Sequence, residues 1–290
     1  MSIRMKPSLA VTLFVFIVTL ANAQEKLTAE DILRHHLDSI GTASTRAATK
    51  SRVVEGTASY RVLVGGSGQI DGKAVIVSEG RRLHMLLKIG AQQYRGEQFI
   101  CDGDKTSVTG TYADKSRSEF GQFLRAEDLP IREGLLGGAL STAWPLIDMD
   151  SRKGKLRYQG LKKVDGIELH AVSYQPKKGT DLDITLLFEP ETFHHVRTVY
   201  TVSLSAGLGM AASGDRASET ASASQQQTRY RIEEKFSDFK LSDGLTLPHH
   251  YDLRFQEELQ NGFTKQVEWE ISTTRVLNNI SVDSRNFQIP

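Results

Sequence analysis

Residues 247–271 read LPHHYDLRFQEELQNGFTKQVEWEI, and this stretch decides the fold. On both sides of Asn261-Gly262, large apolar residues alternate with polar ones. A period of two places successive side chains on opposite faces of a β-strand, and an Asn-Gly pair supplies the positive φ angles of a tight hairpin. The stretch therefore predicts two antiparallel strands with one dry face and one wet face. The dry face holds Tyr251, Leu253 and Phe255 in the first strand and Val267, Trp269 and Ile271 in the second.

The same kind of pattern continues outward from this hairpin. Further runs are rich in β-branched and aromatic residues and are separated by short breaks. Connections this short cannot make parallel crossovers, so the sheet is predicted to be antiparallel and largely a meander. The predicted strands are 60–64, 74–77, 83–89, 92–100, 106–112, 156–158, 168–174, 182–188, 196–204, 230–239, 247–255 and 264–276. The other Asx-Gly pairs are Asp71-Gly72, Asp102-Gly103, Asp165-Gly166 and Asp243-Gly244.

Two segments have helical spacing instead. The first begins at Thr28, whose hydroxyl can cap a helix, and ends at Gly41, a common C-terminal stop. The second is an insert over residues 116–149, in which apolar residues repeat at intervals of three and four. We interpret it as a helical cover, broken by Pro130 and closed by Pro145. Three glycines weaken its helicity by about 1 kcal/mol each, which suits a movable cover and a distorted loop almost equally. These glycines are Gly134, Gly137 and Gly138.

Together these elements predict an α+β protein. Its architecture is a single large curved antiparallel β-sheet, or half-barrel, with helices covering the concave face. The apolar face is expected to be the concave one and to be larger than the two helical segments can seal. The predicted domains are a signal peptide over residues 1–23 and one half-barrel domain over residues 24–290.

The N-terminus predicts export. Arg4 and Lys6 precede an apolar run over residues 9–20, and Ala21-Asn22-Ala23 follows as a small-x-small cleavage signal. The run is shorter than the roughly 20 residues that a membrane-spanning helix needs. We therefore predict a signal peptide that is cut after Ala23. The mature protein is expected in the periplasm, or outside the cell where there is no outer membrane.

The composition excludes several classes of protein. The 290 residues carry 36 basic and 35 acidic side chains, and a net charge of +1 gives no reason to expect a nucleic-acid partner. A single cysteine, Cys101, excludes a disulfide framework and is predicted to be a small buried hydrophobe. Residues 205–227 are a low-complexity tract of Ala, Ser, Gly and Gln, which predicts a disordered loop within the domain.

No pattern of catalytic residues emerges from the chain. Neither a G-x-S-x-G nor an H-E-x-x-H motif occurs. Six of the eight histidines form adjacent pairs, but neighbours on a strand point to opposite faces, so a strand pair offers one ligand at most to a metal site. We interpret the strand pairs as exposed residues at strand ends and predict no catalytic residue, no metal and no cofactor. The pairs are His35-His36, His194-His195 and His249-His250.

Short motifs carry a family resemblance. They are the opening helix that ends at Ile40-Gly41, the segment LSDGLTLP at residues 241–248, and a C-terminal Val282-Asp283 followed by Phe287 and Ile289-Pro290. With the predicted sheet and cover, the chain resembles the LolA/LolB-like superfamily of outer-membrane lipoprotein carriers and their lipid-binding periplasmic relatives, over essentially residues 27–290. The low-complexity tract departs from that pattern. The resemblance implies the fold and a lipid-binding class, and it does not imply lipoprotein sorting itself.

The predicted function is an exported, non-catalytic binding or carrier protein that holds a lipid or another acylated ligand in a hydrophobic concavity. Each methylene that leaves water contributes about 0.8 kcal/mol. A membrane protein or lipoprotein of the envelope is a further candidate partner. For any single candidate lining residue, ordinary core is the favoured alternative. The candidates are Leu86, Phe99, Leu186, Phe188, Tyr251, Leu253, Phe255, Trp269 and Ile271 from strands, with Phe123, Leu136, Leu140 and Trp144 from the cover.

Two alternatives remain open at this point. The same fold could recognise a polypeptide, as an envelope sensor or a protein-interaction module. The histidine pairs could instead assemble the site of a metal-dependent hydrolase, which would need at least three of them to converge.

Overall fold

The computed structural model describes residues 27–91, 94–111, 118–205 and 227–289. The predicted signal peptide over residues 1–23 and nearly all of the predicted loop over residues 205–227 lie outside the described residues. So do residues 116 and 117, the first two of the predicted insert. Within the described ranges, no helix has the length and apolar character that crossing a membrane requires.

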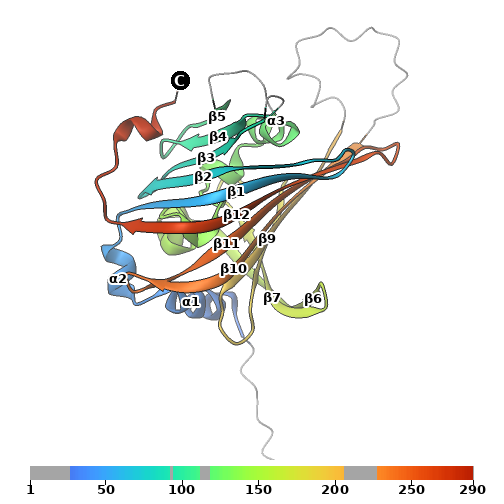
Figure 1. The fold of residues 1–290 in the computed structure, drawn as a ribbon. Coiled ribbons are helices and arrows are strands. Elements are labelled where there is room, and N and C mark those ends of the chain that lie inside the picture. Colours follow the sequence, from blue (N-terminus) through green and yellow to red (C-terminus); the bar gives the residue numbers. More distant parts are fainter. Residues whose placement is uncertain (1–26, 92–93, 112–117, 206–226, 290) are drawn as a thin grey trace, which may run out of the picture.

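Twelve strands form one antiparallel sheet, as the sequence pattern predicts. Their order is β5-β4-β3-β2-β1-β12-β11-β10-β9-β8-β7-β6, so that β5 and β6 are the two edges and the sheet does not close into a barrel. Figure 1 shows the sheet as a curled, open surface. The strands are β1 (Ser51–Val64), β2 (Gln69–Glu79), β3 (Arg82–Ile89), β4 (Gly96–Cys101), β5 (Thr106–Gly110), β6 (Lys155–Val164), β7 (Ile167–Gln175), β8 (Asp183–Phe188), β9 (His195–Ser205), β10 (Gln227–Ser242), β11 (Leu245–Glu258) and β12 (Thr264–Asn278).

The sheet consists of two meanders that are joined by the first and the last strand. One meander runs from β1 to β5 and the other from β6 to β12, and β1 pairs with β12 between them. This pairing places Tyr60 opposite Trp269 and Ala58 opposite Ile271. The apolar face therefore continues across the junction, and the two meanders share one core.

The opening helix is α1 (Ala29–Ile40), as predicted. The Thr28 hydroxyl accepts a hydrogen bond from the Asp31 N–H, and the Asp31 carboxylate accepts one from the Thr28 N–H, which completes a capping box. The sequence pattern did not predict the short helix α2 (Ala43–Ala48) that follows. α1 contacts β11 and β6 on the concave side of the sheet (Figure 1).

The cover is a chain of short helical pieces. Both prolines lie in the first turn of a piece: Pro130 is the second residue of α4, and Pro145 is the first residue of the second 3-10 helix. The insert is interrupted just before Pro130, as predicted. The prediction that Pro145 closes the insert is wrong, because a proline lacks the N–H that is unpaired anyway in a first turn and Pro145 opens a 3-10 helix. The pieces are α3 (Glu119–Ala126), α4 (Leu129–Arg132), η1 (Gly138–Leu140), η2 (Pro145–Asp148) and α5 (Met149–Arg152). A last 3-10 turn, η4 (Ser284–Phe287), lies beside β3.

Two of the predicted turns illustrate the roles of Asp-Gly pairs. Asp165-Gly166 and Asp243-Gly244 close hairpins with positive φ angles at both residues. Asp71-Gly72 lies inside β2 instead, so its prediction as a turn is wrong. A Cβ atom on Gly72 would lie 2.2 Å from the carbonyl oxygen of Lys88 on the neighbouring strand. Because Gly72 has no Cβ atom, β3 can approach β2 closely at this position.

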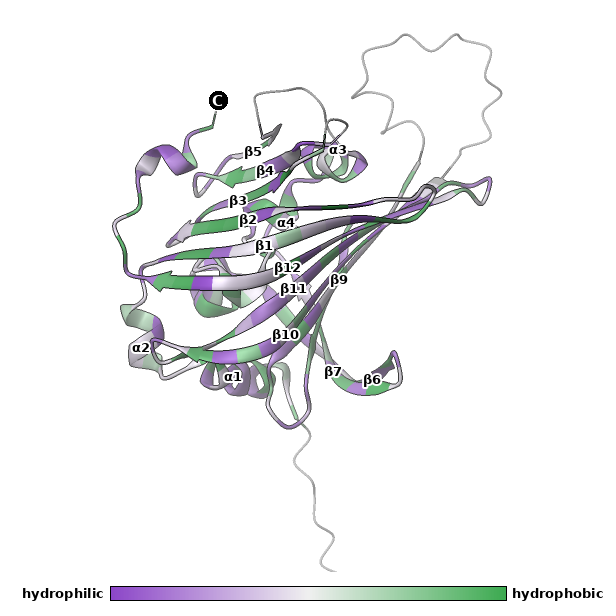
Figure 2. Cartoon of the chain, viewed as in Figure 1, coloured by the Kyte–Doolittle hydropathy of each residue, from purple (hydrophilic) through white to green (hydrophobic). Residues whose placement is uncertain are grey.

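The concave side of the sheet is the apolar core. Along β11 and β12, the residues of the predicted dry face are buried and form one cluster with the cover. Figure 2 shows the alternation of apolar and polar residues along the strands. Cys101 is buried in this cluster as a free thiol, as predicted.

Candidate functional site

The structure brings twelve of the thirteen predicted lining residues together in the core. Each of the twelve is at most 5% exposed. Leu86 is the exception, because Leu83, Met85 and Leu87 of β3 point inward and Leu86 is half-buried on the other face. The twelve are Phe99, Phe123, Leu136, Leu140, Trp144, Leu186, Phe188, Tyr251, Leu253, Phe255, Trp269 and Ile271. That they form a ligand site stays a prediction.

Side chains of the cover fill the concave interior. Phe120 of α3 lies between the rings of Phe99, Phe255 and Trp269, with ring centroids 5.2–5.4 Å apart. Four hollows in the described part of the chain are lined by residues other than these twelve. The expected excess of apolar sheet over cover is thus not seen: the cover occupies the space that a ligand would need.

Residues 134–144, here called the glycine segment, form the central part of the cover that fills the concave interior. The segment has little helical structure of its own, with only the 3-10 turn η1 inside it. Gly134 and Gly137 have φ angles of 68° and 79°, a region that favours glycine. Four large side chains of the segment are fully buried in the sheet's concavity. They are Leu135, Leu136, Leu140 and Trp144.

The backbone of the glycine segment is hydrogen-bonded by side chains from the sheet. The Gly137 N–H donates to Glu234 Oε1 at 2.8 Å, and Arg52 Nη1 donates to the Ala139 carbonyl at 2.6 Å. Such bonds satisfy polar groups that a longer helix would have paired internally. A third bond runs from the Thr142 N–H to Ser78 Oγ at 3.0 Å. The segment is therefore held by a few discrete contacts in addition to its apolar packing.

Glu234 of β10 is the most unusual of these groups, since its side chain is completely buried. Tyr200 Oη donates to Oε2 at 2.6 Å, and Tyr251 Oη donates to Oε1 at 2.7 Å. Burial raises the pKa of Glu234 from 4.5 to about 7, although the hydrogen bonds from Tyr200, Gly137 and Tyr251 oppose the rise. The carboxyl group that holds the Gly137 N–H thus titrates near neutral pH.

His36 of α1 and Trp144 of the cover form another buried polar contact. Trp144 Nε1 donates to His36 Nε2 at 3.1 Å, so His36 carries its proton on Nδ1, which donates to the Phe193 carbonyl at 3.1 Å. Burial lowers the pKa of His36 from 6.5 to about 3. His195 stacks on the indole of Trp144, with ring centroids 4.7 Å apart. The interpretation of His195 as an exposed strand-end residue is wrong, because it is only 2% exposed.

Sequence reasoning missed Glu234 and Arg52, although a signal for Glu234 exists. Ile232, Glu234 and Phe236 follow one another at a spacing of two, and the outer two belong to the core. A carboxylate on the dry face of a strand is costly unless it is hydrogen-bonded. That position predicts a partner for its oxygens, although it does not say which one. Arg52 is at the start of β1, outside the predicted strand over residues 60–64.

The described residues contain no group of three or more His, Cys, Asp or Glu side chains that could hold a metal ion. His249 and His250, the histidine pair on β11, are both half-exposed. His250 Nε2 lies 3.1 Å from Asp252 and 3.9 Å from Glu270.

No protein-family model matches the chain, and no curated protein matches it. Comparison with solved structures gives matches of low sequence identity that extend over most of the chain. A LolA superfamily protein from Nitrosomonas europaea is 11% identical with a TM-score of 0.46, over 91% of this chain and 99% of that one. A candidate outer membrane lipoprotein-sorting domain from Vibrio parahaemolyticus is 8% identical with a TM-score of 0.43, over 89% and 97%. A chain of the Pseudomonas aeruginosa MucA/MucB complex is 11% identical with a TM-score of 0.23, over 87% and 100%. The superfamily of the first structure is the one that this chain resembles in its sequence motifs.

Proposed function

We propose that the protein is an exported, non-catalytic carrier that holds the acyl chain of a lipid or of an acylated protein inside its half-barrel. The chain would take the place that the glycine segment occupies in the structure. The observation that carries the proposal is the glycine segment itself, which fills an aromatic interior with four side chains and little regular structure. The predicted signal peptide supports a place in the periplasm.

The free energy lost when the glycine segment leaves the core is comparable with the free energy gained when an acyl chain takes its place. Burial of one large apolar side chain is worth about 1.5–3 kcal/mol, so the four side chains of the segment account for about 6–12 kcal/mol. At about 0.8 kcal/mol per methylene, about 8–15 methylenes offset their removal. A common acyl chain therefore suffices to displace the glycine segment, whereas displacing α3 and α4 as well would expose several further buried residues. These are Phe120, Phe123, Leu124, Leu129 and Ile131.

Chain length is therefore expected to control binding. A fatty acid of 8 carbons should not bind measurably, because it cannot offset the loss of the glycine segment. Beyond the threshold, each two methylenes should tighten binding about tenfold. Isothermal titration calorimetry with 8-, 12- and 16-carbon fatty acids below their micelle concentrations measures this dependence. Equal binding of all three would indicate adsorption on the surface and contradict the proposal.

A disulfide that locks the glycine segment tests whether the ligand enters beneath it. The Thr142 N–H donates to Ser78 Oγ at 3.0 Å, so the two residues are neighbours, and these are the positions for a pair of cysteines. We expect Ser78→Cys/Thr142→Cys, in a Cys101→Ala background, to lose uptake of a fluorescent 16-carbon fatty acid when oxidised and to recover it when reduced. Thiol titration confirms that the bond has formed.

The two single-cysteine variants, treated with the same oxidant, are the matched controls. They should take up the probe under both conditions, because neither can lock the segment. If the oxidised double variant binds as much probe as its reduced form, the ligand does not enter beneath the glycine segment and the proposal is wrong.

A further inference from the structure

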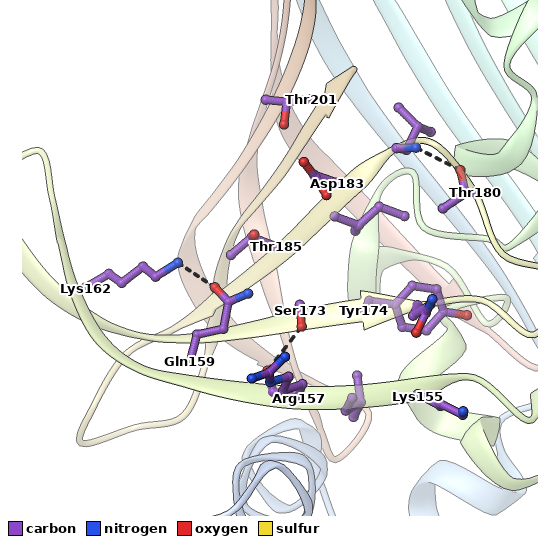
Figure 3. Close-up of a pocket in the computed structure, with 14 residues that line it drawn as sticks. Lys155, Arg157, Gln159, Lys162, Ser173, Tyr174, Thr180, Asp183, Thr185 and Thr201 are labelled. Carbon is purple, nitrogen blue, oxygen red and sulfur yellow. Dashed lines mark hydrogen bonds between the residues drawn. The ribbon is translucent and has the colours of Figure 1, made fainter. Parts of the chain in front are cut away.

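A groove of about 590 Å³ lies where the sheet opens between β7 and β8. The two strands pair only from His170 to Ser173 of β7, opposite Thr185 to Phe188 of β8. Beyond this point, β7 continues along β6 while β8 continues along β9, so a gap opens between the two pairs. Figure 3 shows side chains of β6 and β7 on one side of this groove and those of β8 and β9 on the other.

The charged residues that line the groove are mostly cationic. Lys155, Arg157 and Lys162 of β6 line it, against a single acid, Asp183. Lys162 donates to Gln159, whereas the described residues show no ion pair for either Lys155 or Arg157. Four hydroxyl groups also line the groove, and hydroxyl groups can donate hydrogen bonds to an anion, although that of Ser173 donates to the Arg157 carbonyl in this structure. They belong to Ser173, Thr180, Thr185 and Thr201.

The inner end of the same groove is apolar and belongs to the core. Tyr174, Leu182 and Ile184 line the groove and are members of the main hydrophobic cluster, and Leu156 packs against that cluster. Tyr174 Oη also donates to Glu133 Oε2 of the cover at 2.8 Å. The groove therefore connects a cationic rim with the interior that the cover fills.

We propose that this groove binds the anionic head group of the acylated ligand, a carboxylate or a phosphate, while the chain passes between β7 and β8 into the core. This inference rests on the proposed function. Lysine and arginine together with hydroxyl groups are the side chains that recognise such anions. Cationic residues on an edge strand also prevent pairing with other chains, but that role does not require them to share a hollow with core residues.

The test compares a fluorescent 16-carbon fatty acid with the matching uncharged alcohol. We expect Lys155→Gln/Arg157→Gln to weaken binding of the acid about tenfold, as expected for the loss of two exposed charge contacts, and to leave binding of the alcohol unchanged. Both side chains are exposed, so the variant should remain folded. Lys50→Gln/Lys73→Gln removes the same charge from exposed residues outside the groove and should leave both affinities unchanged.

Each outcome distinguishes the two proposals. If neither the acid nor the alcohol binds to the wild-type protein, the proposed function fails and the head-group site fails with it. If both bind with affinities that Lys155→Gln/Arg157→Gln does not change, the carrier stands and the head-group site is wrong. If inorganic phosphate binds in the groove while the acid gains nothing over the alcohol, the groove is a site for a free anion, which also overturns the inference.

Discussion

Replacement of Trp144 with alanine is expected to lower the free energy of unfolding by about 3–5 kcal/mol. The indole is fully buried, stacks on His195 and donates its N–H to His36. Its removal leaves a cavity in the concave interior and takes away the donor of a buried histidine nitrogen. Chemical denaturation, followed by the fluorescence of the remaining tryptophan Trp269, measures the loss.

The Trp144→Ala variant also tests whether the concave interior can hold a ligand. The cavity should accept indole, so that added indole restores part of the lost stability, because a ligand that binds only the folded protein stabilises it. Trp144→Phe is the matched control, since it keeps a six-membered aromatic ring in the core and removes the N–H donor together with the smaller ring of the indole. We expect this control to cost about 1–3 kcal/mol and to show no response to indole. A loss below 1 kcal/mol in Trp144→Ala would mean that the glycine segment contributes little to the closed interior.

The sheet could be predicted because its strands show their two faces in the sequence. Tyr251, Leu253 and Phe255 alternate with polar residues, and an Asn-Gly pair separates them from the next strand. The pairing of β1 with β12 could not be predicted in this way, because alternation shows which face is dry but not which strand is the neighbour. The cover was predicted as helical from its spacing, but its division into short pieces depends on contacts with the sheet.

The candidate site was predicted only in its apolar part. The dry-face residues such as Leu253 and Trp269 do meet in one core. The sequence could not show that the cover fills this core, because the fit of Trp144 and Leu140 depends on the curvature of the sheet. The polar contacts were missed for another reason: Glu234 and His36 are compatible with the interior only because Gly137, Tyr200 and Trp144 supply their partners.

The contact between Glu234 and Gly137 makes the closed state depend on pH. The pKa of Glu234 rises from 4.5 to about 7 on folding, so the folded protein binds this proton more tightly than the unfolded chain. The stability that the protonated group contributes is present below pH 4.5 and is lost as the pH rises through 7. The rise in the pKa of Glu234 from 4.5 to about 7 corresponds to about 3 kcal/mol in the free energy of unfolding.

His36 has the opposite effect on stability. Its pKa falls from 6.5 to about 3 on folding, so the stability that it contributes is present above pH 6.5 and is lost as the pH falls. Burial also holds the pKa of His195 well below its usual value, so His195 acts in the same direction. The pH profile of the wild-type protein therefore combines opposing slopes, and only a comparison with a variant isolates Glu234.

Glu234→Gln is expected to remove the Glu234 slope, because an amide can still accept the Gly137 N–H and cannot ionise. Between pH 4.5 and 8, the variant should become about 3 kcal/mol more stable relative to the wild-type protein, as measured by chemical denaturation across this range. Parallel profiles of the two proteins would show that Glu234 does not titrate in this window.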